Sequence, residues 1–208
     1  MPSNVTKGLS LHRHVWVPVE GASHTVVALH GTGGDENDLV PLVRQLYPNS
    51  NILGVRGNVM ENGHPRFFKR FAEGMFDEAD IRVRANDLAA FYEAAETAYG
   101  LSANTTTWLG YSNGANMIAA KLLLDDLIRD AVLLRAQHPL KQRPGQPVRV
   151  SDGARVKLFS GEYDTVVPVA ESRRLADALV KRGYAVEHVS QPTGHQLSHH
   201  DIEMLMPK

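Results

Sequence analysis

The segment Gly110-Tyr111-Ser112-Asn113-Gly114 constrains the fold of this chain more than any other stretch. An apolar run over residues 106–109 precedes it. Apolar residues at helical spacing follow it: Ala115, Ile118, Ala119 and Leu122. The pattern therefore predicts a strand, a very tight turn carrying Ser112, and a helix. Glycine on both sides of the serine would remove Cβ clashes and let the strand and the helix pack closely.

Ser112 in such a turn has two interpretations. The predicted helix points its first N–H groups and its positive dipole end at the serine, so negative charge developing there would be stabilised. This favours a catalytic serine. The same motif also fits an ordinary glycine-containing turn whose serine caps a helix. The motif alone leaves both open, and the rest of the chain has to decide.

Short apolar runs alternate with helical patterns along the chain. Strands are expected over residues 11–19, 25–29, 51–55, 106–109, 131–134, 156–160 and 184–189. Helices are expected after Asp35, over 85–99, after Ser112, between Pro168 and Gly183, and from Ser198. This order predicts an α/β fold with a mostly parallel sheet and helices on both faces. Pro18 favours an edge position for the first strand.

Composition narrows the class of protein. At 208 residues the chain is long enough for one domain, 1–208, with a substantial core. Its net charge of −1 with interspersed acids and bases argues against a nucleic-acid-binding face or a polybasic membrane patch. The absence of cysteine excludes disulfides, thiolate metal sites and a cysteine nucleophile. With no signal-peptide pattern and no membrane-length apolar run, we expect a cytoplasmic protein.

Three side chains that could act together follow predicted strands in the order Ser112, Asp164, His195. Ligands of parallel sheets bind beyond the carboxyl ends of the strands, and this Ser–acid–His order is that of the α/β-hydrolases. Histidine can take the serine proton and return it to the leaving group, while a carboxylate orients the imidazole. Glu162 is an alternative acid. Asp164 is favoured because it directly precedes a Val-Pro helix entry.

The turn His30-Gly31-Thr32-Gly33-Gly34 follows an early buried strand. It lacks the spacing and the lysine of a phosphate loop. A flexible glycine turn at this place can present a backbone N–H to an oxyanion, with His30 orienting the loop. The alternative is a plain glycine turn before a helix.

Residues 56–80 contain four of the six phenylalanines and are expected to overhang the site as a loop. We predict that Phe67, Phe68, Phe71 and Met75 wall an apolar substrate pocket. The alternative is that they cover the sheet edge, because aromatic residues are more often core. His138 is a further candidate for the pocket wall or for a surface loop, and residues 141–153 are polar enough to form a surface loop.

A metal site is a competing interpretation of His195, His199 and His200. Gly194 makes His195 pre-helical, however, and no carboxylate has clear ligand spacing. His12 and His14 share a strand face, where a solvated pair is expected. We therefore expect neither a metal nor another cofactor.

At this point the sequence resembles the bacterial carboxylesterases of the phospholipase/carboxylesterase (acyl-protein-thioesterase-like) group. The motifs that carry the resemblance are residues 30–38, Arg56-Gly57-Asn58, Pro65-Arg66-Phe67-Phe68, residues 110–116 and Gly194-His195-Gln196-Leu197. They match the branch with quinone- and catechol-induced members and span nearly the whole chain. The segment 134–139 is less typical of the group, which leaves the polarity of the pocket open.

The resemblance implies a compact α/β-hydrolase without a large lid domain that hydrolyses small carboxylic esters. It assigns Ser112 as the nucleophile, Asp164 as the acid and His195 as the base. The oxyanion hole becomes the backbone N–H groups of Thr32 and Asn113. Related thioesterases often form dimers, which suggests a homodimer.

The main functional prediction is thus a cofactor-free serine carboxylesterase. A thioesterase or lysophospholipase acting on longer acyl chains is a second interpretation. A third is a sensor that binds an aromatic such as a quinone without turnover, since one fold hosts unrelated functions. A complete triad argues against the sensor, because pure binding needs none of the three residues.

Overall fold

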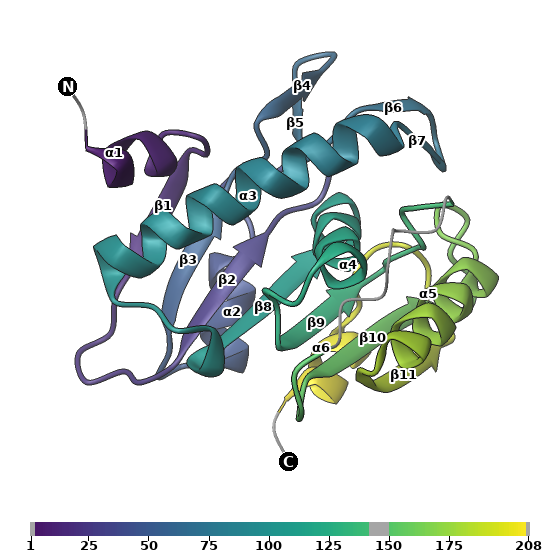
Figure 1. Ribbon diagram of the computed structural model, residues 1–208. Helices are drawn as coiled ribbons and strands as arrows, with labels where there is room; N and C mark the ends of the chain where they lie inside the picture. The colour runs from purple at the N-terminus through teal and green to yellow at the C-terminus, as the bar shows by residue number, and fades with distance from the viewer. Residues whose placement is uncertain (1–2, 142–149, 207–208) are drawn as a thin grey trace.

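The computed structural model describes residues 3–141 and 150–206, and its centre is a seven-stranded sheet (Figure 1). Its strands are β1 (His14–Val17), β2 (Thr25–Leu29), β3 (Asn51–Val55), β8 (Thr106–Tyr111), β9 (Asp130–Leu134), β10 (Arg155–Gly161) and β11 (Ala185–Gln191). Their order across the sheet is β1-β3-β2-β8-β9-β10-β11. All neighbours pair in parallel except the edge strand β1, which is antiparallel to β3.

Helices cover both faces of the sheet, which confirms the predicted α/β architecture. They are α1 (Asn4–Leu9), α2 (Val40–Leu46), α3 (Glu78–Tyr99), α4 (Asn113–Leu124), α5 (Val169–Arg182) and α6 (His199–Leu205), with a short 3₁₀ turn at Ala103–Thr105. Apolar side chains of α3, α4 and α5 belong to the larger core cluster, while those of α2 and α6 belong to the cluster on the opposite face. No helix in the described part of the chain is long and apolar enough to cross a membrane.

Two helix boundaries differ from the prediction. The helix expected directly after Asp35 begins only at Val40, because the Asp35 carboxylate instead accepts the backbone N–H of Asn37 in a local turn. Helix α3 begins at Glu78 rather than near residue 85, since Asp77 caps it by accepting the N–H of Asp80. Its predicted end at Gly100, in the left-handed conformation, is confirmed.

Residues 56–80 are more regular than predicted. They form two small hairpins, β4 (Val59–Glu61) with β5 (His64–Arg66), and β6 (Arg70–Ala72) with β7 (Met75–Phe76). Figure 1 shows both hairpins beside the N-terminal half of α3. Of the predicted surface loop 141–153, residues 142–149 lie outside the described residues.

Candidate active site

The predicted strand, turn and helix around Ser112 are present as β8, a one-residue turn and α4. Ser112 has φ 51° and ψ −111°, a conformation that side-chain-bearing residues rarely adopt. A Cβ on Gly110 would lie 2.7 Å from the backbone nitrogen of Ala115, and one on Gly114 would lie 2.2 Å from the carbonyl oxygen of Leu29. Both glycines are therefore required for the close approach of helix and strands at the serine.

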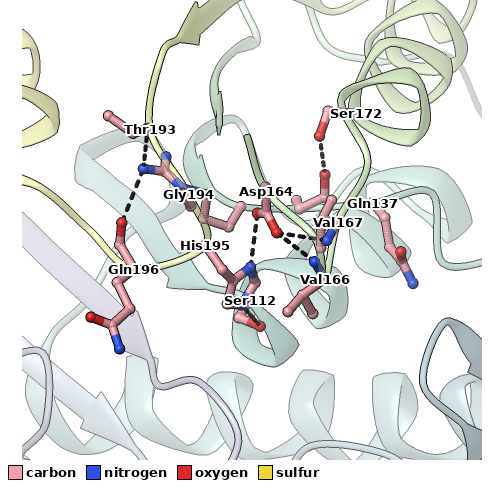
Figure 2. Close-up of polar contacts among 12 residues, drawn as sticks. Ser112, Gln137, Asp164, Val166, Val167, Ser172, Thr193, Gly194, His195 and Gln196 are labelled. Atoms are coloured by element: carbon pink, nitrogen blue, oxygen red, sulfur yellow. Dashed lines mark hydrogen bonds and ion pairs between the residues drawn. The ribbon is translucent and has the colours of Figure 1, made fainter. Parts of the chain in front are cut away.

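The loops after three parallel strands bring Ser112, His195 and Asp164 together (Figure 2). His195 Nε2 lies 2.9 Å from Ser112 Oγ, and His195 Nδ1 lies 2.8 Å from Asp164 Oδ2. An ionised carboxylate only accepts hydrogen bonds, so it fixes the proton on Nδ1 and leaves Nε2 free to accept from the serine hydroxyl. This tautomer is the one that a general base for Ser112 requires.

The carboxylate that contacts His195 in this geometry is Asp164 and not Glu162. The Asp164 side chain is fully buried, and its Oδ1 accepts the backbone N–H groups of Val166 and Val167 at 2.8 Å each. Glu162 is exposed, and among the described residues its side chain has no bond to His195. In the turn before the Val-Pro helix entry, one carboxylate oxygen of Asp164 therefore binds backbone N–H groups and the other contacts His195.

The sequence analysis missed Arg135, whose side chain forms hydrogen bonds to the loop that carries His195. Its guanidinium is fully buried and donates to Gly194 O at 2.8 Å, Thr193 Oγ1 at 3.0 Å and Gln196 O at 3.4 Å. It also pairs with Asp201 Oδ2 at 2.6 Å. One side chain thus fixes the backbone on both sides of His195. One sequence signal pointed to it, since this arginine directly follows the apolar strand β9 and lies inside the atypical segment 134–139.

Asp201 links this anchor to the start of α6. Its carboxylate accepts from the backbone N–H and the hydroxyl of Ser198, in a capping box. Burial disfavours the charged form, but the hydrogen bonds from Arg135 and Ser198 outweigh it and hold the pKa of Asp201 below its usual range. The charged pair therefore persists at neutral pH.

Replacing Arg135 by methionine should lower kcat for a short ester about 10²-fold with a much smaller change in KM, because a displaced base costs rate more than binding. It should also destabilise the fold by about 3–5 kcal/mol, since Asp201 is left buried without its partner. Steady-state kinetics and urea unfolding measure the two effects. The double variant R135M/D201L should recover stability without recovering kcat, and recovery of both would show that Arg135 does not position His195.

The glycine turn after β2 lies beside the serine. Within the described residues, the backbone N–H groups of Thr32 and Asn113 donate to no protein acceptor. Both residues line the same cavity as Ser112. Two unused N–H donors in the cavity that holds the Ser112 hydroxyl could stabilise an oxyanion formed there.

His30 ties this turn to the loop after β3, in line with the prediction that it orients the turn. Its Nε2 accepts the N–H of Gly57 at 3.0 Å, so Nδ1 carries the proton and donates to Gly31 O at 2.5 Å. Burial lowers the pKa of His30, which keeps the ring neutral and able to make both bonds.

A cavity of about 260 Å³ opens over Ser112. It is lined by Thr32, Arg66, Arg70, Glu73, Gly74, Phe76, Tyr111, Ser112, Asn113, Asn116, Gln137, Val166, Val167 and His195. The hairpin segment overhangs the site as predicted, because Arg66, Arg70 and Phe76 all come from it. The wall combines charged side chains with apolar ones such as Phe76, Val166 and Val167.

The predicted apolar pocket wall is wrong for Phe67 and Phe68. Both have no exposed surface and belong to the larger core cluster, so they cover the sheet, as the alternative interpretation held. Phe71 and Met75 are 75% and 55% exposed. Together with His138 they line a second hollow of about 90 Å³ next to the main cavity. The phenylalanine cluster thus splits between core and surface.

The other histidines do not gather around a common centre. His199 and His200 lie on α6 within 3.6 Å of the Glu203 carboxylate, whereas His195 turns to Asp164. Among the described residues no group of three or more histidine, aspartate or glutamate side chains has the geometry to hold a metal ion.

Known proteins resemble this chain in fold and in sequence. No family model matches the chain. A protein named as a hydrolase, MhqD of Bacillus subtilis (strain 168), is 40% identical over 184 residues, which cover 88% of this chain and 90% of MhqD. The carboxylesterase of Bacillus cereus is 34% identical with a TM-score of 0.85, over 98% of this chain and 96% of that one. The carboxylesterase from Mesorhizobium loti is 28% identical with a TM-score of 0.86, over 94% and 92%.

These similarities extend over nearly the whole chain and join a hydrolase sequence to carboxylesterase structures. They agree with the resemblance that the motifs carried. The chain belongs to the phospholipase/carboxylesterase (acyl-protein-thioesterase-like) group of α/β-hydrolases and is a carboxylic ester hydrolase.

Proposed function

We propose that the protein is a serine carboxylesterase that hydrolyses small esters through Ser112, His195 and Asp164. The observation that carries the proposal is the unbroken chain of two hydrogen bonds, 2.9 Å and 2.8 Å, that ends with Ser112 Oγ in a cavity. A serine hydroxyl is a poor nucleophile unless a base removes its proton during attack. The chain of hydrogen bonds supplies that base and its orienting carboxylate.

The reaction proceeds in two halves. Ser112 Oγ attacks the ester carbonyl carbon while its proton passes to His195 Nε2, and the N–H groups of Thr32 and Asn113 stabilise the oxyanion. The tetrahedral intermediate collapses to an acyl-enzyme, and the imidazolium gives its proton to the departing alcohol. Water then attacks the acyl-enzyme with His195 as base again, which releases the acid and restores Ser112.

The size of the cavity supports small substrates. About 260 Å³ lies below the roughly 300–1,000 Å³ typical of pockets for drug-sized ligands. A long acyl chain would have to leave the cavity and lie on the surface.

Turnover of 4-nitrophenyl acetate, butyrate, octanoate and palmitate tests the proposal. We expect kcat/KM to rise no further beyond acetate or butyrate, because a CH₂ group that stays in water gains none of the roughly 0.8 kcal/mol that burial would give. Rising kcat/KM with chain length would favour the thioesterase or lysophospholipase interpretation. Failure to hydrolyse any ester, combined with stabilisation by a quinone, would favour the sensor.

A further inference from the structure

Two arginines line the cavity that contains Ser112, at its hairpin side. Arg66 ends β5 and Arg70 begins β6, so the turn between the hairpins presents both. No step of the proposed ester hydrolysis uses either one. Two guanidinium groups in a small cavity beside a nucleophile raise the question of which substrate they recognise.

Arg66 forms the buried part of this wall. It is 2% exposed, its Nη1 donates to Thr32 Oγ1 at 2.6 Å, and its Nε donates to Phe68 O at 3.2 Å. Burial and the neighbouring charge of Arg70 lower the pKa of Arg66 to about 10, which leaves it charged at neutral pH. Arg66 thus places a positive charge directly beside the Thr32 turn.

Arg70 has unused donors. Its Nε donates to both carboxylate oxygens of Glu61, at 3.0 Å and 3.1 Å. Its two terminal nitrogens have no acceptor in the part of the chain that the structure describes, although the residue lines the cavity. The terminal fork of an arginine matches the two oxygens of a carboxylate.

The carboxylates near Arg66 and Arg70 do not use up the hydrogen-bond donors on this side of the cavity. Glu61 pairs with Arg66 as well as Arg70, so one negative charge is shared by two positive ones, and Glu61 is not a lining residue. Glu73 lines the cavity but is exposed, in the turn between β6 and β7. Asn116 adds an amide donor, because its Oδ1 is occupied by the N–H of Gln137.

We propose that Arg66 and Arg70 form an anion subsite, and that the preferred substrates are small esters carrying a free carboxylate. Arg70 supplies the fork that binds the carboxylate, and Arg66 supplies a fixed charge behind it. The inference rests on the proposed esterase function and names its substrate class. The carboxylate can belong to the acyl part, as in the monoester of a dicarboxylic acid, or to the alcohol part.

Matched pairs of esters test the subsite. For the acyl side the pair is 4-nitrophenyl hydrogen glutarate and its methyl ester, and for the alcohol side it is 4-acetoxybenzoate and its methyl ester, each corrected for uncatalysed hydrolysis. We expect kcat/KM to favour the anionic member of one pair. Arg70→Met should lower that preference, measured as the ratio of kcat/KM for the anionic ester to kcat/KM for the neutral one, about tenfold, as expected for loss of a charge-assisted hydrogen bond.

Three variants act as controls. Arg155→Met also removes one positive charge, but Arg155 opens β10, is 68% exposed and pairs with Asp130, so the preference should not change. Arg70→Lys should retain part of the preference, since it keeps the charge and loses the fork. Glu73→Gln should raise the preference, because it removes the one carboxylate among the lining residues.

A binding measurement separates this inference from the esterase proposal. In Ser112→Ala, glutarate should raise Tm and neutral glutaramide should not, and the added change Arg70→Met should abolish the glutarate shift. Equal preferences in wild type, Arg70→Met and Arg155→Met, without a glutarate shift, would overturn the subsite while ester hydrolysis stands. A glutarate shift that depends on Arg70 in a protein that hydrolyses no ester would sustain the subsite and refute the esterase.

Discussion

Replacing Ser112 by alanine should lower kcat/KM for 4-nitrophenyl acetate by about 10⁴-fold or more, because the nucleophile is lost and only the oxyanion donors and binding remain. The fold should stay intact. Alanine keeps the Cβ at φ 51°, and within the described part of the chain the removed hydroxyl is bonded only to His195. Thermal unfolding should therefore shift by no more than a few degrees, which separates lost chemistry from lost structure.

The chain offers a matched control for Ser112→Ala. Ser160 Oγ lies 2.8 Å from His188 Nε2, so a second serine–histidine pair exists on β10 and β11, away from the cavity lining. Burial lowers the pKa of His188, and among the described residues no carboxylate bonds to its other ring nitrogen. Ser160→Ala should leave kcat/KM within about twofold of wild type. If Ser112→Ala retained a tenth of wild-type activity, Ser112 would not be the nucleophile.

Replacing Asp164 by asparagine should lower kcat by about 10⁴-fold without unfolding the protein. Oδ1 of Asp164 accepts two backbone N–H groups, from Val166 and Val167, so the amide oxygen of asparagine must occupy that position. Its NH₂ group then faces His195 Nδ1 and donates to it. Nδ1 becomes the acceptor, Nε2 carries the proton, and His195 cannot take the proton of Ser112.

The measurement is the pH dependence of kcat for Asp164→Asn, together with a crystal structure of the variant. Activity should remain low at neutral pH while the His195–Ser112 distance stays near 2.9 Å. Glu162→Gln, which changes the neighbouring exposed carboxylate, should retain wild-type kcat. Near-normal activity in Asp164→Asn would mean that the carboxylate does not set the tautomer of His195.

The fold could be predicted from sequence where local patterns decide the structure. The alternation of short apolar runs with helical periods gives the parallel sheet, and Gly110 and Gly114 are required by backbone contacts only a few residues or one strand away. The proximity of Ser112, Asp164 and His195 could also be predicted, since each follows a strand and the carboxyl ends of parallel strands meet at one edge of the sheet. The hydrogen bonds among these three residues join positions far apart in sequence, and they are seen only in the structure.

Other features depend on contacts that no local pattern carries. Phe67 and Phe68 are the residue type expected in an apolar pocket wall, yet both lie buried in the core. Arg66 and Arg70 of the same segment line the cavity instead. Arg135 contacts residues 193–201 across the chain, and nothing near it in sequence indicates those partners. Side chains whose role is fixed by distant neighbours were the ones that the sequence could not place.

Covalent labelling tests the central claim, that Ser112 forms an ester with the substrate, most directly. The protein is incubated with diethyl 4-nitrophenyl phosphate, which transfers a stable phosphoryl group to an activated serine, and is then analysed by intact and peptide mass spectrometry. We predict one adduct per chain, on Ser112, with a matching release of 4-nitrophenolate and no labelling of His195→Ala. An adduct on another residue, or an unlabelled protein that still hydrolyses esters, would contradict the assignment of Ser112 as the nucleophile.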